Sequence, residues 1–374
     1  MLGLLRNANR TWLSQCVCIE TVMKNLNRKN HMTNFQATYS DLINELYNHR
    51  IFTFCPYILD RYKKNLELHL DKPWENLRPI FFLSAFEKLS AETNTDPTTD
   101  EEKKKLYILA WSVELYQSSV LSHDDLSDNG LIREGKQTWF DKYERKMVCI
   151  YDTQLLYTTA HFLLDTYFKE DKNIFHINNI FDDSMYRFSW SQILDLVLPK
   201  DLKGKMTEEY NNLARERIGS NKSKMFVSLP IKLAVLQTGL YNEDINEQID
   251  DICFKMGLLW TAWDDYVDCY PDKNLKERTF NDIEEGKCSW LIVNALKHAT
   301  DSQRQILTAN YGIRDSKNAS VVKDIYKELD MTTKFKSYKN EMISAINEDL
   351  KKLSNPTVKI VFDDMLLKTE KWAV

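Results

Sequence analysis

Residues Ser122–Gly130 read SHDDLSDNG and place three aspartates within five positions, after an apolar run and before a basic one. Asp124 and Asp128 are four residues apart, so on a helix they share a face, one turn above each other, with Asp125 beside them. Like charges at that spacing repel unless a cation binds between them. Mg²⁺ takes oxygen ligands of this kind. The segment therefore predicts either a magnesium site or a solvated helix end.

The DDxxD spacing occurs a second time, 140 residues downstream, in Trp263–Asp268 (WDDYVD). Both copies follow strongly apolar stretches, which indicates that each acidic set closes a buried helix. One copy alone fits a surface helix equally well, whereas two copies favour metal binding. Carboxylates attract a diphosphate only through bridging cations, and about three Mg²⁺ around one diphosphate would act as a Lewis acid on the leaving group. The predicted metal ligands are Asp124, Asp125, Asp128, Asp264, Asp265 and Asp268.

Basic side chains from other helices are expected to complete an anion site around such a diphosphate. The candidates are Arg133, five residues after Asp128, Lys222 in SNKSKMF, and Arg278 and Lys287 in ERTFNDIEEGKCSW. Each of them alone is typical of a solvated surface cation. Their grouping around the acidic motifs favours a binding role.

The composition predicts an all-α chain. It has 374 residues, 43% of them hydrophobic, with only 9 Gly and 8 Pro. Few helix breakers and a recurrent helical spacing of apolar residues, as from Leu106 to Leu121, favour long helices over strands. Pro230 is expected to interrupt one of these helices. The net charge of −5 implies no basic face for nucleic acid, and no apolar run reaches the ~18 residues of a membrane-spanning helix.

We divide the chain into a variable leader, residues 1–34, and a single domain, residues 35–374, because no long linker interrupts the latter. The leader has Arg6 and Arg10 and no acidic residue before Glu20. That is typical of a mitochondrial transit peptide, and a disordered tail or an additional first helix is the alternative. The cysteines form no CxxC motif, which fits a reducing compartment. We therefore expect a cytoplasmic protein, with mitochondrial import as the alternative.

Together these motifs resemble the trans-isoprenyl diphosphate synthase family, from about residue 65 to beyond residue 350. The resemblance is carried by WSVELYQ (111–117), HDDLSD (123–128), REGKQTW (133–139), YRFSWSQILD (186–195), Lys222-Ser223 before Leu229-Pro230, WDDYVD (263–268) and NDIEEGKCSWLIVNAL (281–296). It implies an all-α isoprenoid synthase (prenyltransferase) helical bundle around a central cavity, usually as a homodimer.

The resemblance also assigns roles. Asp124, Asp128 and Asp264 would be the chief magnesium ligands, and Asp125, Asp265 and Asp268 would support them. Arg133, Lys222, Arg278 and Lys287 would bind the allylic diphosphate. The family motifs add four further substrate-binding positions, namely Ser223, Gln192, Arg78 and Gln117.

The sequence departs from the family where a second diphosphate, that of isopentenyl diphosphate, would bind. The family uses a Gly-Lys-x-x-Arg segment, two adjacent arginines and a glutamine there. This chain keeps Arg78 and Gln117, but Glu75 stands in place of the lysine and Glu134 in place of the second arginine. Two cations become two anions, and at an effective dielectric of 20 each such contact with an anion costs on the order of 4 kcal/mol before screening.

This asymmetry predicts a terpene synthase, of the kind that some insects derive from this scaffold. It would ionise farnesyl diphosphate with Mg²⁺ and cyclise or rearrange the cation to a sesquiterpene, releasing diphosphate. The small Ser119 and Val120 before the first motif would admit a fifteen-carbon tail. One alternative is a chain-elongating farnesyl or geranylgeranyl diphosphate synthase with a rebuilt second site, using Lys72 and Arg78. Another is a non-catalytic partner subunit, against which the six retained aspartates argue.

Overall fold

The computed structural model describes residues 28–53, 55–71, 77–133, 136–143, 147–201, 208–270 and 282–370. Within these ranges the chain is helical except for short connections and one antiparallel ribbon of two residues per strand, β1 (Ile132–Arg133) and β2 (Lys136–Gln137). The prediction of an all-α chain is confirmed.

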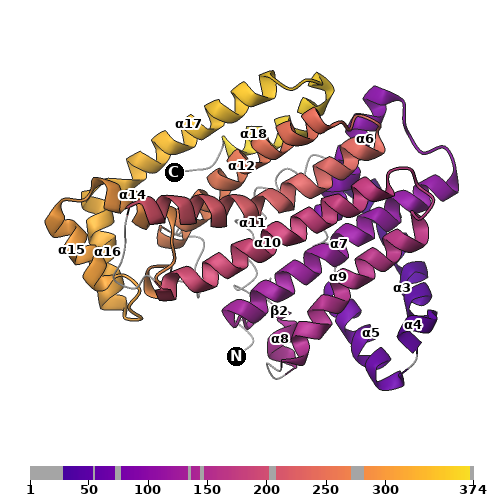
Figure 1. The fold of residues 1–374 in the computed structure, drawn as a ribbon, viewed down its shortest axis with the longest axis horizontal. Helices are drawn as coiled ribbons and strands as arrows, with labels where there is room; N and C mark the ends of the chain where they lie inside the picture. Colours follow the sequence, from indigo (N-terminus) through magenta and orange to yellow (C-terminus); the bar gives the residue numbers. More distant parts are fainter. Residues whose placement is uncertain are drawn as a thin grey trace.

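Long helices lie side by side and form the body of the molecule (Figure 1). They are α6 (Leu77–Thr93), α7 (Asp100–Asp128), α9 (Val148–Tyr167), α10 (Ile174–Asp201), α11 (Glu208–Gln237), α12 (Glu243–Cys269) and α17 (Met331–Lys351). The pairs α7–α9, α10–α11 and α11–α12 pack most extensively. Helices α7, α10 and α12 run in the same direction, so their C-terminal ends lie at the same end of the bundle (Figure 1).

Shorter helices flank this body at both ends. Before α6 come α2 (Arg28–Ala37), α3 (Tyr39–Asn48), α4 (Arg50–Thr53) and α5 (Pro56–Leu70), and α8 (Trp139–Lys142) follows the ribbon. After α12 come α13 (Asp282–Glu285), α14 (Trp290–His298), α15 (Asp301–Asn310), α16 (Ser316–Glu328), the 3₁₀ turn η2 (Pro356–Val358) and α18 (Lys359–Thr369). Helix α2 runs across the predicted boundary at residue 35, and residues 1–27, with the predicted transit peptide, lie outside the described residues.

Helix α7 has well-defined ends that fix the position of the first acidic motif. Its first turn is held by a capping box, in which the Thr99 hydroxyl accepts from the Glu102 N–H at 3.2 Å and the Glu102 carboxylate accepts from the Thr99 N–H at 3.0 Å. It ends at Asn129, whose φ of 53° is left-handed, and the Gly130 N–H donates to the Asp125 carbonyl at 2.8 Å. Asp124–Asp128 is therefore the last turn of α7.

Helix α12 repeats this arrangement. The Asn242 side chain caps its start by accepting from the Ile245 N–H at 2.9 Å, and the helix ends at Cys269, directly after WDDYVD. Carboxylates in a last turn oppose the helix dipole, because the C-terminal end already carries partial negative charge. Both acidic motifs thus occupy helix ends where a bound cation would relieve the repulsion.

The predicted interruption at Pro230 is wrong. Pro230 lies buried inside α11, which continues from Glu208 to Gln237. A proline inside a helix loses a hydrogen bond and costs about 3 kcal/mol. Helix α11 packs against α6, α10 and α12, and burial on three sides offsets that cost.

The buried apolar side chains form two clusters that share Tyr338 at their edge. The larger one fills the bundle, where Trp111 stacks on Phe35 with ring centroids 4.0 Å apart. The smaller one lies between the end of α12 and helices α14 to α17, around Trp290 and Phe335. No helix among the described residues is long and apolar enough to cross a membrane.

Candidate active site

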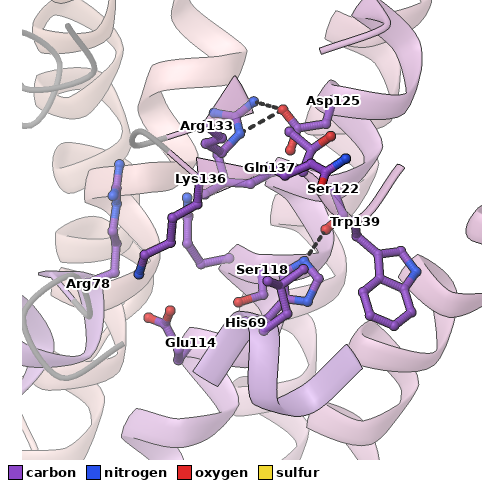
Figure 2. Close-up of a pocket in the computed structure, with 14 residues that line it drawn as sticks. His69, Arg78, Glu114, Ser118, Ser122, Asp125, Arg133, Lys136, Gln137 and Trp139 are labelled. Carbon is purple, nitrogen blue, oxygen red and sulfur yellow. Dashed lines mark hydrogen bonds and ion pairs between the residues drawn. The ribbon is translucent and has the colours of Figure 1, made fainter. Parts of the chain in front are cut away.

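The first acidic motif is paired with Arg133, which β1 directs back onto the end of α7. Its Nη2 lies 2.7 Å from Asp125 Oδ1, and its Nε donates to the same oxygen at 2.8 Å (Figure 2). Its Nη2 also lies 3.0 Å from Asp124 Oδ2. Burial alone would lower the pKa of the Arg133 guanidinium, but the charges of Asp125 and Asp124 raise it above its ordinary value. Arg133 therefore neutralises the acidic pair when no other cation is bound.

Gln192 connects this motif to α10, because its Nε2 donates to Asp124 Oδ1 at 3.1 Å. Asp195, one turn later on α10, lies near the second motif. Burial raises the pKa of the Cys288 thiol to about 12, and the charges of Asp265 and Asp195 contribute in the same direction. Helix α10 thus contacts the first motif through Gln192, and the charge of Asp195 acts on Cys288 near the second.

The second motif is held by contacts with the segments that follow it. Asp265 Oδ2 accepts the N–H of Trp290, the first residue of α14, at 2.5 Å, and Arg215 Nε lies 4.0 Å away. Burial raises the pKa of Asp265, although Arg215 and the Trp290 N–H oppose it. Asp268 Oδ2 accepts the Asp282 N–H at 3.1 Å.

Asp282 is a further carboxylate at this motif, partly exposed, that the sequence analysis did not single out. Burial raises its pKa well above its ordinary value, and the charges of Asp265 and Asp268 raise it further, while Lys287 acts against them. The motif therefore brings together four carboxylates, Asp264, Asp265, Asp268 and Asp282. The raised pKa values of Asp265 and Asp282 mean that these two resist ionisation until positive charge arrives.

Lys287 lies beside this motif on a tightly held segment. Its carbonyl accepts from the Tyr311 hydroxyl at 2.5 Å, and its N–H donates to the Asp282 carbonyl at 3.0 Å. Gly286 and Gly312 have φ of 71° and 76°, and a Cβ on Gly286 would lie 3.1 Å from the Gly312 Cα. Only glycine fits this backbone approach.

Several predicted residues cannot be placed by their side chains. Lys222 and Ser223 lie in α11 and Asp128 ends α7, but the structure describes only their backbone. Arg278, together with Lys72, Glu75 and Glu134, lies outside the described residues. The expectation that all the basic residues gather around one diphosphate therefore stays a prediction for Lys222 and Arg278.

The residues do fit Mg²⁺ by their chemistry, since carboxylate oxygens are its preferred ligands. Among the described side chains, however, no three carboxylates, imidazoles or thiols are drawn into a preformed metal site. The physical reason at the first motif is that Arg133 already contacts both Asp124 and Asp125. Cation binding would have to displace that guanidinium.

A polar pocket, which Arg133 and Asp125 also line, lies between α5, α6, α7 and the β1–β2 ribbon (Figure 2). Arg78 and Gln117, both predicted substrate-binding residues, line it and are 6% and 4% exposed. Arg78 Nε and Gln117 Nε2 are buried donors without a hydrogen-bond partner in the part of the chain that the structure describes. Lys136 also points toward this space, opposite Glu114 (Figure 2).

His69 and Ser122 form a hydrogen-bonded pair in the pocket wall. His69 Nδ1 lies 2.8 Å from the Asn65 carbonyl, which can only accept, so Nδ1 carries a proton. His69 Nε2 lies 2.7 Å from Ser122 Oγ (Figure 2). With a neutral ring, Ser122 donates to His69 and presents its lone pairs to the pocket. Like Arg215, His69 carries no local motif that would have identified it in the sequence, whereas Lys136 lies within the quoted REGKQTW motif but was given no role there.

Solved structures identify the class to which this fold belongs. The chain superimposes on the farnesyl diphosphate synthase of T. brucei with a TM-score of 0.79 at 21% sequence identity, covering 91% of this chain and 99% of that one. The fold is therefore that of the isoprenoid synthases, as the motifs predicted.

Sequence comparisons identify the family. The sequence model of the family described as Polyprenyl synthetase matches residues 60–329. A chloroplastic monoterpene synthase, FDS-5, of Artemisia spiciformis is 29% identical over 94% of this chain and 86% of its own length. Farnesyl pyrophosphate synthase 2 of Arabidopsis thaliana is 30% identical over 73% of this chain and 80% of its own length. The chain belongs to the polyprenyl synthetase family, as its resemblance to the trans-isoprenyl diphosphate synthases predicted.

Proposed function

We propose that the protein ionises an allylic prenyl diphosphate with the help of Mg²⁺ held between its two acidic motifs. The observation that carries this proposal is the repeated placement of aspartates in the last turns of α7 and α12, at the same end of the bundle (Figure 1). Asp124, Asp128 and Asp264 would be the chief ligands, with Asp125, Asp265 and Asp268 in support. The bound Mg²⁺ would supply Lewis-acid stabilisation of the departing diphosphate.

The basic residues would act on the leaving group. Arg133 now neutralises Asp124 and Asp125. Once those carboxylates bind cations, the guanidinium can turn to the diphosphate and contribute charge-assisted hydrogen bonds. Lys287, on its fixed segment beside the second motif, would do the same from the other side, together with Lys222 and Arg278.

The fate of the allylic cation separates two candidate functions. The first is chain elongation with isopentenyl diphosphate, which the names of the relatives support better than cyclisation. Farnesyl pyrophosphate synthase is also the name of similar proteins in Gallus gallus and Zea mays. The pocket beside Arg133 favours this function too, because the buried donors of Arg78 and Gln117 are suited to an anion. Lys136 would supply the further positive charge of a rebuilt second site.

The second candidate is the terpene synthase predicted from the sequence. It is supported by Glu75 and Glu134, which stand where the family has cations, and by the likeness to a relative named monoterpene synthase. Ser119 and Val120 are buried below the first motif, and the Ser119 hydroxyl donates to the Thr153 carbonyl at 3.0 Å. Small side chains there leave length for a farnesyl tail. A non-catalytic partner subunit remains the third alternative, and the six retained aspartates argue against it.

One set of incubations separates these functions. The purified protein, with Mg²⁺, receives geranyl or farnesyl diphosphate, each with and without isopentenyl diphosphate, and the products are analysed by gas chromatography after phosphatase treatment. Longer prenyl alcohols only when isopentenyl diphosphate is present establish elongation. Terpenes formed from farnesyl diphosphate alone establish cyclisation. Absence of any Mg²⁺-dependent diphosphate release in all four incubations would overturn the proposal of ionisation.

We also propose a homodimer, with α9 and α10 as the contact. Aromatic and aliphatic side chains recur at helical spacing on the exposed face of α10, where Tyr186, Trp190 and Ile193 are 63%, 51% and 56% exposed. On α9, Tyr151 is 74% exposed. An apolar face of this kind on a folded domain is typical of an interaction surface. Sedimentation of the wild type and of Trp190→Glu tests it: loss of a dimer in the variant supports this face, and a wild-type monomer contradicts it.

A further inference from the structure

Arg215 is a buried cation that the sequence analysis missed. It lies on α11 and is 8% exposed. Its Cζ lies 5.9 Å from the ring centroid of Trp290 and 5.6 Å from that of Tyr338. Its Nε and Nη2 are buried and find no hydrogen-bond partner among the described residues. Donors of a buried guanidinium left unpaired cost free energy, so a role beyond packing is indicated.

The carboxylate nearest to this guanidinium is the middle one of the second acidic motif. Arg215 Nε lies 4.0 Å from Asp265 Oδ2, which is within reach of an ion pair but too long for a hydrogen bond. That oxygen already accepts the Trp290 N–H at 2.5 Å. Asp265 is therefore held between the guanidinium and the N-terminus of α14, where a negative charge is favourable.

A close approach of α11 and α12 sets this pairing. Gly219, one turn after Arg215, faces Thr261, one turn before Asp265, and a Cβ on Gly219 would lie 3.2 Å from the Thr261 side-chain carbons. The Thr261 hydroxyl donates to the Gly219 carbonyl at 3.2 Å. The close packing at this point fixes the alignment of α11 and α12 along their axes, and this alignment places Arg215 beside Asp265.

We infer that Arg215 is a positioning residue of the second acidic motif. It supplies the counter-charge that keeps the Asp265 carboxylate against the start of α14, and so fixes the last turn of α12, from which Asp264 and Asp268 project. It acts through Asp265 and does not touch the substrate. This inference rests on the proposed function, since it concerns the carboxylates that would hold Mg²⁺.

The test measures binding without turnover. Calorimetry gives the apparent dissociation constant of inorganic diphosphate at one fixed Mg²⁺ concentration for the wild type, Arg215→Met, Asp265→Asn and the double variant. Arg215→Met is expected to weaken binding about tenfold in the wild-type background and less than about twofold in the Asp265→Asn background, because contacting residues couple. Arg215→Lys, which keeps the charge, should restore most of the affinity.

Lys232 offers a matched control on the same pair of helices. It is a buried cation of α11, its Nζ lies 2.6 Å from Asp250 Oδ1 on α12, and it is about 25 Å along the helix from Arg215. Lys232→Met should lower the thermal stability and leave diphosphate binding unchanged, which separates a general loss of packing from the proposed role.

The outcomes distinguish the two proposals. If the wild type binds no diphosphate in the presence of Mg²⁺, the proposed function fails. Two results would overturn the positioning role of Arg215 if the wild type binds diphosphate. One is that Arg215→Met, like Lys232→Met, leaves the affinity for diphosphate unchanged. The other is that Arg215→Met weakens the affinity by the same factor in the wild-type and Asp265→Asn backgrounds. Should Arg215→Met fail to fold, the comparison of Arg215→Lys with Asp265→Asn decides, since a positioning role requires the lysine variant to bind more tightly.

Discussion

Arg133 Nη2 lies 2.7 Å from Asp125 Oδ1, so a basic residue predicted to bind the substrate is paired with a predicted metal ligand. Arg133→Gln is expected to lower the free energy of unfolding of the metal-free protein by about 3 kcal/mol, because it leaves two largely buried carboxylates without a counter-charge. Denaturant unfolding in the presence of a chelator measures this.

The same experiment with Mg²⁺ and diphosphate should show a smaller loss, since bound cations then replace the guanidinium. Arg187→Gln is the control, because Arg187 forms a half-exposed pair with Asp183, and exposed pairs contribute at most about 1 kcal/mol. An equal loss with and without Mg²⁺ would show that Arg133 is purely structural.

Replacing the chief predicted ligands should remove most of the activity. For Asp124→Asn and for Asp264→Asn we expect the rate of diphosphate release from farnesyl diphosphate to fall at least about a hundredfold. Each substitution removes a negative charge that would hold Mg²⁺, the Lewis acid, at the leaving group. Asp60→Asn, at an exposed pair with Lys64, should retain the wild-type rate. Near-normal rates in both aspartate variants would refute the metal site.

Arg78 tests the pocket beside the first motif. Arg78→Gln is expected to weaken the binding of isopentenyl diphosphate about tenfold, since a charged hydrogen bond contributes about 1.5–3 kcal/mol. The KM of the allylic substrate should not change, and it serves as the internal control. If calorimetry detects no isopentenyl diphosphate bound to the wild type, elongation is excluded and cyclisation is the remaining fate.

Replacing Glu75 and Glu134 by the basic residues that the family has at these positions should strengthen the binding of isopentenyl diphosphate. Glu75→Lys combined with Glu134→Arg is expected to tighten isopentenyl diphosphate binding at least about tenfold. Each substitution replaces a repulsive contact with the diphosphate by an attractive one, and each such contact is of order 4 kcal/mol before screening. Glu92→Lys with Glu101→Lys changes the net charge equally at exposed positions of α6 and α7 and controls for long-range attraction. Equal gains in both double variants would contradict a local effect.

Asp282 should make the stability of the metal-free protein depend on pH. Its pKa is raised in the folded state by burial, so the folded protein holds this proton more tightly than the unfolded chain. The resulting stabilisation is complete below the pKa of the unfolded carboxyl, about 3.9, and is lost as the pH rises toward the folded pKa.

Thermal unfolding of the metal-free protein from pH 4 upward tests this expectation. The thermal midpoint of Asp282→Asn minus the thermal midpoint of the wild type should increase as the pH rises. Addition of Mg²⁺ and diphosphate should make this increase smaller. Asp165→Asn, at an exposed position on α9, should show no such trend. A constant difference at all pH values would contradict a raised pKa of Asp282.

The sequence predicted what depends on local pattern. Apolar periodicity and the scarcity of breakers indicated the long helices, and DDxxD spacing located both acidic motifs at helix ends. What it missed depends on tertiary register. Arg215 meets Asp265 only because α11 and α12 touch at Gly219, and Asp282 becomes part of the second motif because its N–H reaches Asp268. Pro230 was misjudged because packing on three sides outweighs a local preference.

The paired glycines at 286 and 312 have a consequence for the energetics of ligand capture. Their backbones pack against each other so closely that the position of Gly286, directly before Lys287, is tightly restricted. The entropy cost of ordering the backbone at this point is therefore met during folding. Binding of an anion does not have to meet it again. More of the attraction between Lys287 and its ligand then appears as affinity.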